Sequence, residues 1–175
     1  GGFGIDCFYF SKQFETVTHC EINTELSTIV AHNFKQLKIN NITTFSGDAL
    51  DFLRSTKEKF DCIYIDPSRR DAVKGKVFLL QDCVPNVPEN IDFLFLKTNQ
   101  ILIKTSPILD ITSAINELKF IKEVHVVAVH NEVKELLFLL DKKHSKAIEI
   151  KTVNIGKKQI KTFDFKYKED LYSDY

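Results

Sequence analysis

Short β-rich runs alternate with helical patterns along this sequence, and this alternation constrains the fold more than any other feature. The β-rich runs cover residues 16–20, 42–46, 60–65, 100–104 and 124–129. Between the first two runs, residues 24–37 repeat apolar side chains at helical spacing, and Asn23 or Thr24 is suited to cap that helix. A second helical pattern covers residues 111–118. Because such alternation is typical of βαβ units, we expect an α/β fold with a mostly parallel sheet and helices on both faces.

The rhythm changes after the run at 124–129. Only residues 131–134 separate it from the apolar run at 135–140, and this connection is too short for a crossover helix. We therefore expect the second run to return antiparallel, so that the parallel sheet ends in a closing hairpin.

A second hairpin is predicted nearer the end of the sequence. Residues 147–154 and 159–165 alternate with period two around the turn-like segment 155–158. We expect the α/β domain to occupy residues 1–141, with its first strand missing at the N-terminus. Residues 142–175 would then be a basic β-hairpin that starts an appended C-terminal module.

Charge is distributed unevenly between these two parts. The segment 142–168 carries a balance of +7, which leaves the remainder of the chain at −7. Its nine lysines are Lys142, Lys143, Lys146, Lys151, Lys157, Lys158, Lys161, Lys166 and Lys168. Lysine-rich ribbons contact phosphate backbones, and Lys157, Lys158 and Lys161 are the expected contacts. Lysines that protect a solvated strand edge would give the same pattern.

Composition restricts the class of protein further. The chain has 175 residues, of which 43% are hydrophobic, so it can fill the core of one domain. No apolar run approaches the ~20 residues of a membrane helix, and we expect no membrane span. The sequence contains no Met. We therefore expect it to begin inside a longer chain.

The cysteines and histidines show no metal-binding pattern. The four cysteines lack C-x-x-C spacing and lie in apolar contexts, so we expect buried free thiols and a reducing, cytoplasmic location. The five histidines show no ligand spacing with cysteines or carboxylates. We expect them at the surface or at sheet ends, and we expect no metal.

Three successive elements bring ligand-binding chemistry to the carboxyl ends of the first predicted strands. Gly2 and Gly4 would let the backbone approach a ligand where a first strand turns into a first helix. Cys7 replaces the third glycine of a dinucleotide fingerprint, which disfavours a nicotinamide cofactor. Glu21 ends the next strand, where a carboxylate can accept hydrogen bonds from ribose hydroxyls. Asp48 ends the following strand, near an adenine or as a helix cap.

A fourth element stands where such folds place their active site. Asp66 and Pro67 follow a buried apolar strand directly. Ser68, Arg69 and Arg70 come next, and a guanidinium can stack on a base or pair with a phosphate. These three residues are the expected substrate contacts of the loop, although a solvated loop would have the same composition.

In order and spacing, these elements resemble the motifs of class I S-adenosylmethionine-dependent methyltransferases. The matching segments are Gly2-Phe3-Gly4-Ile5-Asp6, Glu21, Gly47-Asp48-Ala49 and Asp66-Pro67. The resemblance covers roughly residues 1–141 and implies a Rossmann-like methyltransferase sheet. The sequence is most similar to bacterial members with a C-terminal THUMP-like module, which are relatives of RNA guanine-N2 methyltransferases. Residues 66–70 and 103–110 suggest that subgroup.

The resemblance implies a role for each matched position. S-adenosylmethionine would be bound by Gly2, Gly4, Asp6, Glu21, Asp48 and Ala49. Asp66 and the carbonyl of Pro67 resemble the D-P-P-Y motif of amino-methylating enzymes, which orients an exocyclic amine toward the sulfonium methyl group. Where that motif usually has an aromatic residue, this sequence has Arg69.

The leading hypothesis is therefore methylation of a base amine in RNA, either tRNA or rRNA. The alternative is a module that binds the donor without catalysis and acts in RNA binding or assembly, because Ser68 and Arg69 replace Pro and Tyr. A nicotinamide oxidoreductase is disfavoured by Cys7 and by Asp66-Pro67.

Overall fold

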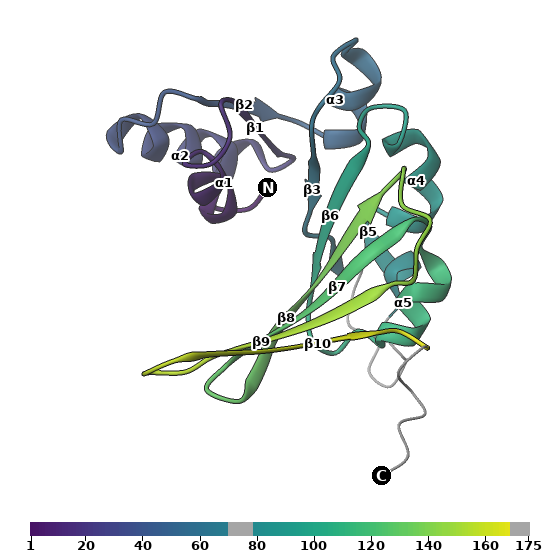
Figure 1. Cartoon of the computed structure of the whole chain (residues 1–175). Helices are drawn as coiled ribbons and strands as arrows, with labels where there is room; N and C mark the ends of the chain where they lie inside the picture. The colour runs from purple at the N-terminus through teal and green to yellow at the C-terminus, as the bar shows by residue number, and fades with distance from the viewer. Residues whose placement is uncertain (70–78, 169–175) are drawn as a thin grey trace. The chain divides into compact units, whose positions relative to one another are not determined.

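The computed structural model describes residues 1–69 and 79–168 (Figure 1). The chain forms two units, Gly1–Glu58 and Lys59–Tyr175, which are described separately. The elements of the first unit are α1 (Ile5–Phe10), β1 (Val17–Glu21), α2 (Thr24–Gln36), β2 (Ile42–Ser46) and α3 (Ala49–Ser55).

The first unit contains a parallel βαβ arrangement. β1 and β2 pair in parallel, with Glu21 opposite Ser46, and α2 connects them. The helix predicted at 24–37 is confirmed, and Asn23 caps it by accepting a hydrogen bond from the Leu26 N–H at 3.0 Å. The cap satisfies one of the N–H groups that have no partner within the helix.

The core of the first unit includes a histidine. His19 in β1 is only 1% exposed, and its ring packs edge-to-face on Phe34 of α2 at 6.0 Å between centroids. The expectation of a surface or sheet-end position is wrong for this residue, because alternation along β1 directs its side chain inward. Burial lowers the pKa of His19.

The second unit has a six-stranded sheet in the order β10-β9-β7-β8-β6-β3 and a separate β4-β5 pair. Its strands are β3 (Ile63–Ile65), β4 (Ser68–Arg69), β5 (Cys83–Val84), β6 (Gln100–Thr105), β7 (Ile121–Val129), β8 (Glu132–Asp141), β9 (Glu149–Ile155) and β10 (Ile160–Lys166). Its helices are the short 3-10 helix η1 (Leu80–Asp82), α4 (Val87–Leu94) and α5 (Ile111–Glu117). Within this unit, α4 and α5 lie on one side of the sheet (Figure 1), so helices on both faces stay a prediction for the chain.

The strand directions make this sheet mixed. β3 and β6 are parallel, as are β7 and β9, whereas β8 is antiparallel to both β6 and β7, and β10 to β9. The expected hairpin of β7 and β8 is confirmed, but it does not close the sheet at an edge. β8 lies between β6 and β7 instead.

The sequence of β8 suits a central position. Leu136, Phe138 and Leu140 are at most 2% exposed on one face, and the intervening Leu137 and Leu139 are half-buried on the other. A continuous apolar run of this kind is typical of a strand covered on both faces. The expectation of a mostly parallel sheet with one closing hairpin is thereby corrected.

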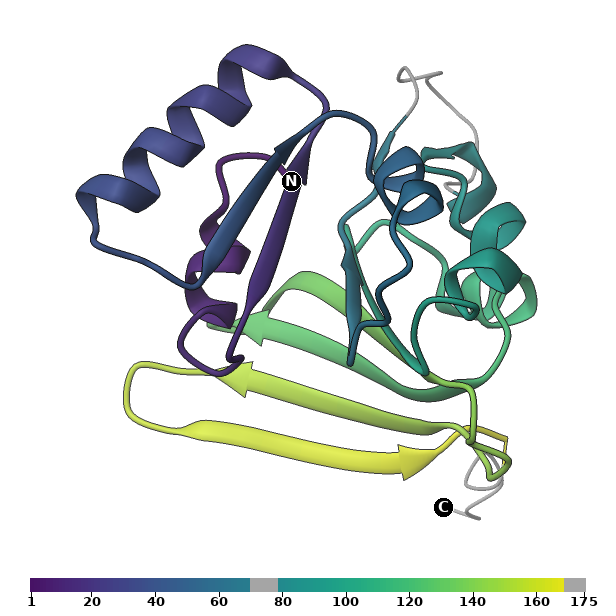
Figure 2. The ribbon, with the colours of Figure 1, turned by 90° about the horizontal axis from the view of Figure 1, so that it is seen from above.

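The predicted hairpin of β9 and β10 is also present, and it extends the same sheet. β9 pairs in parallel with β7 from Glu123 opposite Glu149 onward, and β10 follows at the edge (Figure 2). The division of the chain at residue 141 stays a prediction, but strands on both sides of it belong to one sheet.

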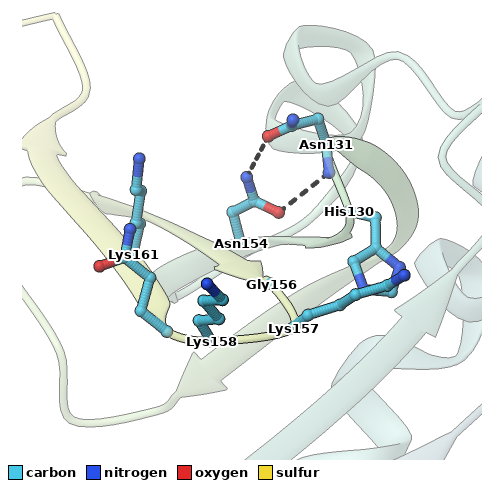
Figure 3. Close-up of a pocket in the computed structure, with 8 residues that line it drawn as sticks. His130, Asn131, Asn154, Gly156, Lys157, Lys158 and Lys161 are labelled. Carbon is cyan, nitrogen blue, oxygen red and sulfur yellow. Dashed lines mark hydrogen bonds between the residues drawn. The ribbon is translucent and has the colours of Figure 1, made fainter.

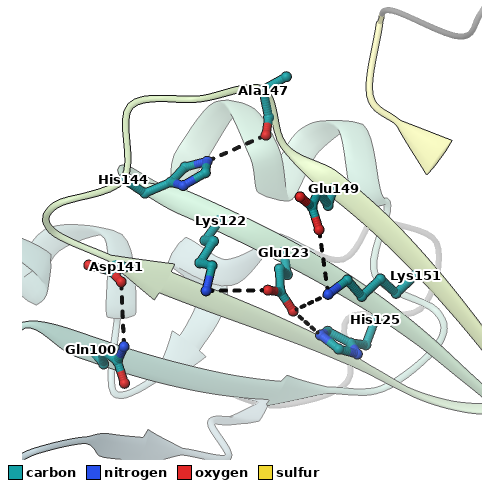
Figure 4. A network of polar contacts seen from close by, with 9 residues as sticks. All are labelled: Gln100, Lys122, Glu123, His125, Asp141, His144, Ala147, Glu149 and Lys151. Atoms are coloured by element: carbon teal, nitrogen blue, oxygen red, sulfur yellow. Dashed lines mark hydrogen bonds and ion pairs between the residues drawn. The ribbon is translucent and has the colours of Figure 1, made fainter. Parts of the chain in front are cut away.

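A polar network joins β7 to β9 (Figure 4). Glu123 is 9% exposed and lies 2.9 Å from His125 Nε2 and 3.1 Å from Lys151 Nζ, with Lys122 Nζ at 3.5 Å. Burial raises the pKa of Glu123, but the contacts with Lys151 and His125 outweigh it and hold the pKa below its ordinary value. The network therefore stabilises the junction of these two strands around an ionised carboxylate.

None of the four cysteines forms a disulfide. Cys83 is buried as expected, whereas Cys7, Cys20 and Cys62 are half-buried. In residues 1–69 and 79–168, no group of three or more His, Cys, Asp or Glu side chains is arranged to hold a metal ion. None of the described helices combines the length and the apolar character needed to cross a membrane.

Candidate functional site

The first unit begins with a left-handed glycine turn ahead of α1. Gly2 has a φ of 58° and Gly4 a φ of 72°, a region that side chains with a Cβ rarely adopt. A Cβ on Gly4 would approach Phe34 to 2.6 Å, whereas a Cβ on Gly2 would meet no atom within 4 Å. Gly4 is therefore required by packing, and the turn at Gly2 borders open space.

Glu21 ties this turn to the carboxyl end of β1. Its Oε2 accepts a hydrogen bond from the Gly2 N–H at 2.7 Å, and its Oε1 accepts one from the Asn23 N–H at 2.8 Å. Burial raises the pKa of Glu21, but these backbone donors, together with the Gly1 ammonium 3.2 Å from Oε2, outweigh it and keep the pKa below its ordinary value. An ionised carboxylate has about four acceptor sites, so it can also accept hydrogen bonds from ligand hydroxyls.

Asp48 lies at the carboxyl end of the neighbouring strand. The Gly47 N–H donates to the Glu21 carbonyl at 2.9 Å, which joins the ends of β1 and β2. Asp48 caps α3, because its Oδ1 accepts hydrogen bonds from the N–H groups of Leu50 at 2.7 Å and Asp51 at 3.2 Å. Its Oδ2 has no partner among the described residues. Capping and ligand binding are therefore compatible at this position.

The remaining residues expected to bind the donor lie at helix starts. Asp6 is in the first turn of α1 and is half-buried, and Ala49 opens α3 and is exposed. The first unit thus brings Gly2, Glu21 and Asp48 to the carboxyl ends of two adjacent parallel strands. This is the edge at which open α/β sheets bind ligands.

Asp66 in the second unit has a partner that was not predicted. It directly follows β3, whose register with β6 sets Ile65 opposite Ile103, so that Lys104 lies beside it. Lys104 Nζ is 3.1 Å from Asp66 Oδ2, and the same ammonium lies over the Tyr64 ring at 5.9 Å from the centroid. The available signal was a lysine directly after the apolar run 101–103.

The residues after Asp66 are only partly described. Pro67 is half-buried, and Ser68 in β4 is exposed, its Oγ donating to the Val84 carbonyl at 3.4 Å. The backbone of Arg69 pairs with Cys83 in β5. Arg70, Lys74 and Lys76 lie outside the described residues.

The three lysines singled out in the sequence line one hollow of about 400 Å³ at the end of the sheet (Figure 3). His130 and Asn131 from the β7–β8 turn line it together with residues of the β9–β10 turn. The lining residues are His130, Asn131, Asn154, Gly156, Lys157, Lys158, Gln159 and Lys161. The structure therefore places Lys157, Lys158 and Lys161 together.

Comparison with protein families finds one match, in the first part of the chain. Residues 1–83 match the family described as Conserved hypothetical protein 95. No curated protein matches the chain.

The solved structures that resemble this chain share the α/β fold of methyltransferases. A candidate methyltransferase from Porphyromonas gingivalis W83 is 28% identical with a TM-score of 0.83, covering 97% of this chain and 43% of that one. An rRNA methylase from Streptococcus thermophilus is 13% identical with a TM-score of 0.55, covering 82% of each chain. A candidate methyltransferase from Streptococcus mutans in complex with SAH is 11% identical with a TM-score of 0.54, covering 80% of this chain and 83% of that one. This chain thus spans less than half the length of the Porphyromonas gingivalis protein.

Proposed function

We propose that this protein binds S-adenosylmethionine and transfers its methyl group to a base amine in RNA, either a tRNA or an rRNA. The observation that carries the proposal is the buried Glu21 carboxylate, which joins a left-handed glycine turn to the carboxyl end of β1 beside Asp48. A nucleoside with two ribose hydroxyls suits such an acceptor, and Gly2 leaves space for the ligand to pass. The S. mutans protein, which has the same fold, was solved in complex with SAH.

Asp66 would orient the acceptor amine. Lys104 occupies Oδ2, and Oδ1 has no partner among the described residues, so it can accept a hydrogen bond from an amine N–H. S-adenosylmethionine would supply the methyl group: the amine nitrogen would bond to the methyl carbon as the carbon–sulfur bond breaks, S-adenosylhomocysteine would leave, and the methylated nitrogen would release one proton to solvent. Positioning and electrostatics supply the catalysis in such a step.

Two features support RNA as the acceptor. The segment 142–168 has a balance of +7, and three of its lysines line one hollow. One protein with this fold is an rRNA methylase. A cytoplasmic location fits four cysteines that form no disulfide, and a THUMP-like module after residue 141 is part of the same proposal.

Two measurements test the proposal in the intact protein. Calorimetry should show binding of S-adenosylmethionine and S-adenosylhomocysteine, and label from the methyl group should transfer to total RNA. Mass spectrometry of nucleosides would then identify the methylated base. Donor binding without transfer would instead support the non-catalytic RNA-binding or assembly module.

A further inference from the structure

The hollow at the end of the sheet has a fixed framework. His130 and Asn131 have φ values of 52° and 66°, as a tight two-residue hairpin turn requires. Asn131 and Asn154 exchange hydrogen bonds, with the Asn131 N–H donating to Asn154 Oδ1 at 3.1 Å and the Asn154 Nδ2 donating to Asn131 Oδ1 (Figure 3). These contacts tie the β7–β8 turn to β9, so that residues of this turn and the lysines line the same hollow.

An exposed aromatic residue, Phe163, lies on β10 two positions after Lys161 of this hollow. Lys161, Phe163 and Phe165 share one face of the strand, because side chains alternate with period two. Phe165 is opposite Ile150, which is buried, whereas Phe163 is 66% exposed. The two rings lie 5.8 Å apart between centroids, and the Phe163 carbonyl accepts a hydrogen bond from Thr152 Oγ1 at 2.9 Å. The Phe163 ring therefore lies next to the Phe165 ring, and most of the Phe163 side chain is open to solvent.

The charges on this face are of one sign. Asn154 is opposite Lys161, so both side chains share the face that lines the hollow. Asp164 is opposite Lys151 and belongs to the other face. Among the described residues that line the hollow there is no carboxylate.

We propose that this face of β10 binds single-stranded RNA, with an unpaired base stacked on Phe163 and the adjoining phosphates bound by Lys157, Lys158 and Lys161. Aromatic side chains that bases can stack on, next to basic side chains that bind phosphates, are the elements with which proteins bind single strands. The base of a duplex has no free face to stack, so the arrangement selects unpaired RNA. The inference rests on the proposed function, since it names the form of RNA and a surface that binds it.

Binding of fluorescent oligoribonucleotides to the intact protein tests this assignment. The single-stranded form should bind more tightly than the duplex of the same sequence. Phe163→Ala should weaken single-strand binding by roughly tenfold to a hundredfold without changing its salt dependence. Phe163→Tyr keeps the ring and should restore binding. Ile160→Ala is the matched control, because Ile160 is 65% exposed on the opposite face of the same strand.

Replacing the lysines should change the salt dependence of RNA binding, unlike replacing Phe163. Replacing Lys157, Lys158 and Lys161 with Gln should lower the salt slope of binding by about 0.7 for each phosphate that is no longer neutralised. Lys143→Gln with Lys146→Gln, outside this face, should leave the slope unchanged. Equal effects of Phe163→Ala and Ile160→Ala on single-strand binding, or equal binding of the single strand and the duplex, would overturn the assignment.

Calorimetry with S-adenosylhomocysteine separates this inference from the proposed function. If the protein binds the donor and transfers methyl groups, but Phe163→Ala leaves single-strand binding unchanged, the stacking surface alone is rejected. Single-strand binding through Phe163 without donor binding would reject methyl transfer and keep the surface.

Discussion

The ammonium of Lys104 lies 3.1 Å from the carboxylate of Asp66, although the two residues come from different segments of the second unit. Parallel pairing of β3 with β6 makes them neighbours just beyond Ile65 and Ile103. Asp66 remains half exposed, so the ion pair orients the carboxylate without removing it from solvent. A carboxylate fixed by one oxygen and open at the other suits the orientation of an amine.

Asp66→Ala should reduce methyl transfer about 10²–10³-fold and leave donor affinity within a few-fold, because the proposed partner of Asp66 is the acceptor. Transfer kinetics and calorimetry check the two halves of this expectation. Asp61→Ala, an exposed acid before the same strand, is the control. Near-normal turnover of the Asp66 variant would exclude amino-methylation through this residue.

Glu21→Ala should weaken binding of S-adenosylhomocysteine by about 1–3 kcal/mol, because ribose hydroxyls would lose a charged acceptor. Calorimetry measures the effect, and Glu25→Ala, an exposed acid in the first turn of α2, should bind normally. Glu21 also fixes the glycine turn, so the melting temperature must be compared with that of Glu21→Gln, which keeps an acceptor oxygen for one of the two N–H groups, Gly2 or Asn23. Unchanged affinity of Glu21→Ala for S-adenosylhomocysteine would show that Glu21 does not bind the donor.

The two glycines of the turn should respond differently to alanine. Gly4→Ala introduces a Cβ within 2.6 Å of Phe34 at a left-handed position, and should destabilise the protein by several kcal/mol. Gly2→Ala meets no atom within 4 Å and should cost about 1–2 kcal/mol from backbone strain alone. Denaturant unfolding measures both. Equal losses would contradict the packing difference.

The thiols of Cys7 and Cys20 should alkylate slowly at neutral pH. Burial raises the pKa of each to about 11, from an ordinary value of 9.0. Their thiolate population at pH 8 is therefore about a hundredfold below that of an ordinary cysteine. Iodoacetamide labelling followed by peptide mass spectrometry should show rates that rise with pH up to about 11, and fast labelling at pH 8 only after unfolding. Fast native labelling would show that these thiols are not held in the protonated form.

Glu123→Gln should destabilise the protein by about 1–3 kcal/mol at pH 7, since the ion pairs are buried on the glutamate side but partly exposed on the lysine side. Because folding lowers the pKa of Glu123 from 4.5, its contribution is present above about pH 4.5 and is lost as the pH falls through the folded value. Unfolding at several pH values should show the gap between wild type and variant closing in acid. A gap independent of pH would assign the loss to packing.

The parts of the fold that depend on local sequence could be predicted from the sequence alone. Apolar spacing and the cap at Asn23 locate α2. The short connection at residues 131–134 locates the β7–β8 hairpin, and period-two alternation locates the β9–β10 hairpin. α4 was missed although Asn86 caps it, accepting a hydrogen bond from the Glu89 N–H at 3.1 Å, and a proline stands in its first turn. That signal was local and available.

The rest depends on which strands become neighbours, which no local pattern fixes. The pairing of Lys104 with Asp66 follows from the β3–β6 register, and the Glu123 network follows from the pairing of β7 with β9. Alternation in the sequence predicts that Lys161 and Phe163 share one face of a strand. The exposure of Phe163 could not be predicted, because it depends on β10 being the edge strand.

The place of β8 between β6 and β7 also bears on the order of folding. β8 meets β7 across the two-residue turn at His130 and Asn131, so closing this loop costs little entropy. Its contacts with β6 join residues as distant in sequence as Gln100 and Asp141, and they close a much longer loop. The β7–β8 hairpin should therefore form early and dock on β6 as a unit, and the transition state for folding should be most structured around this turn.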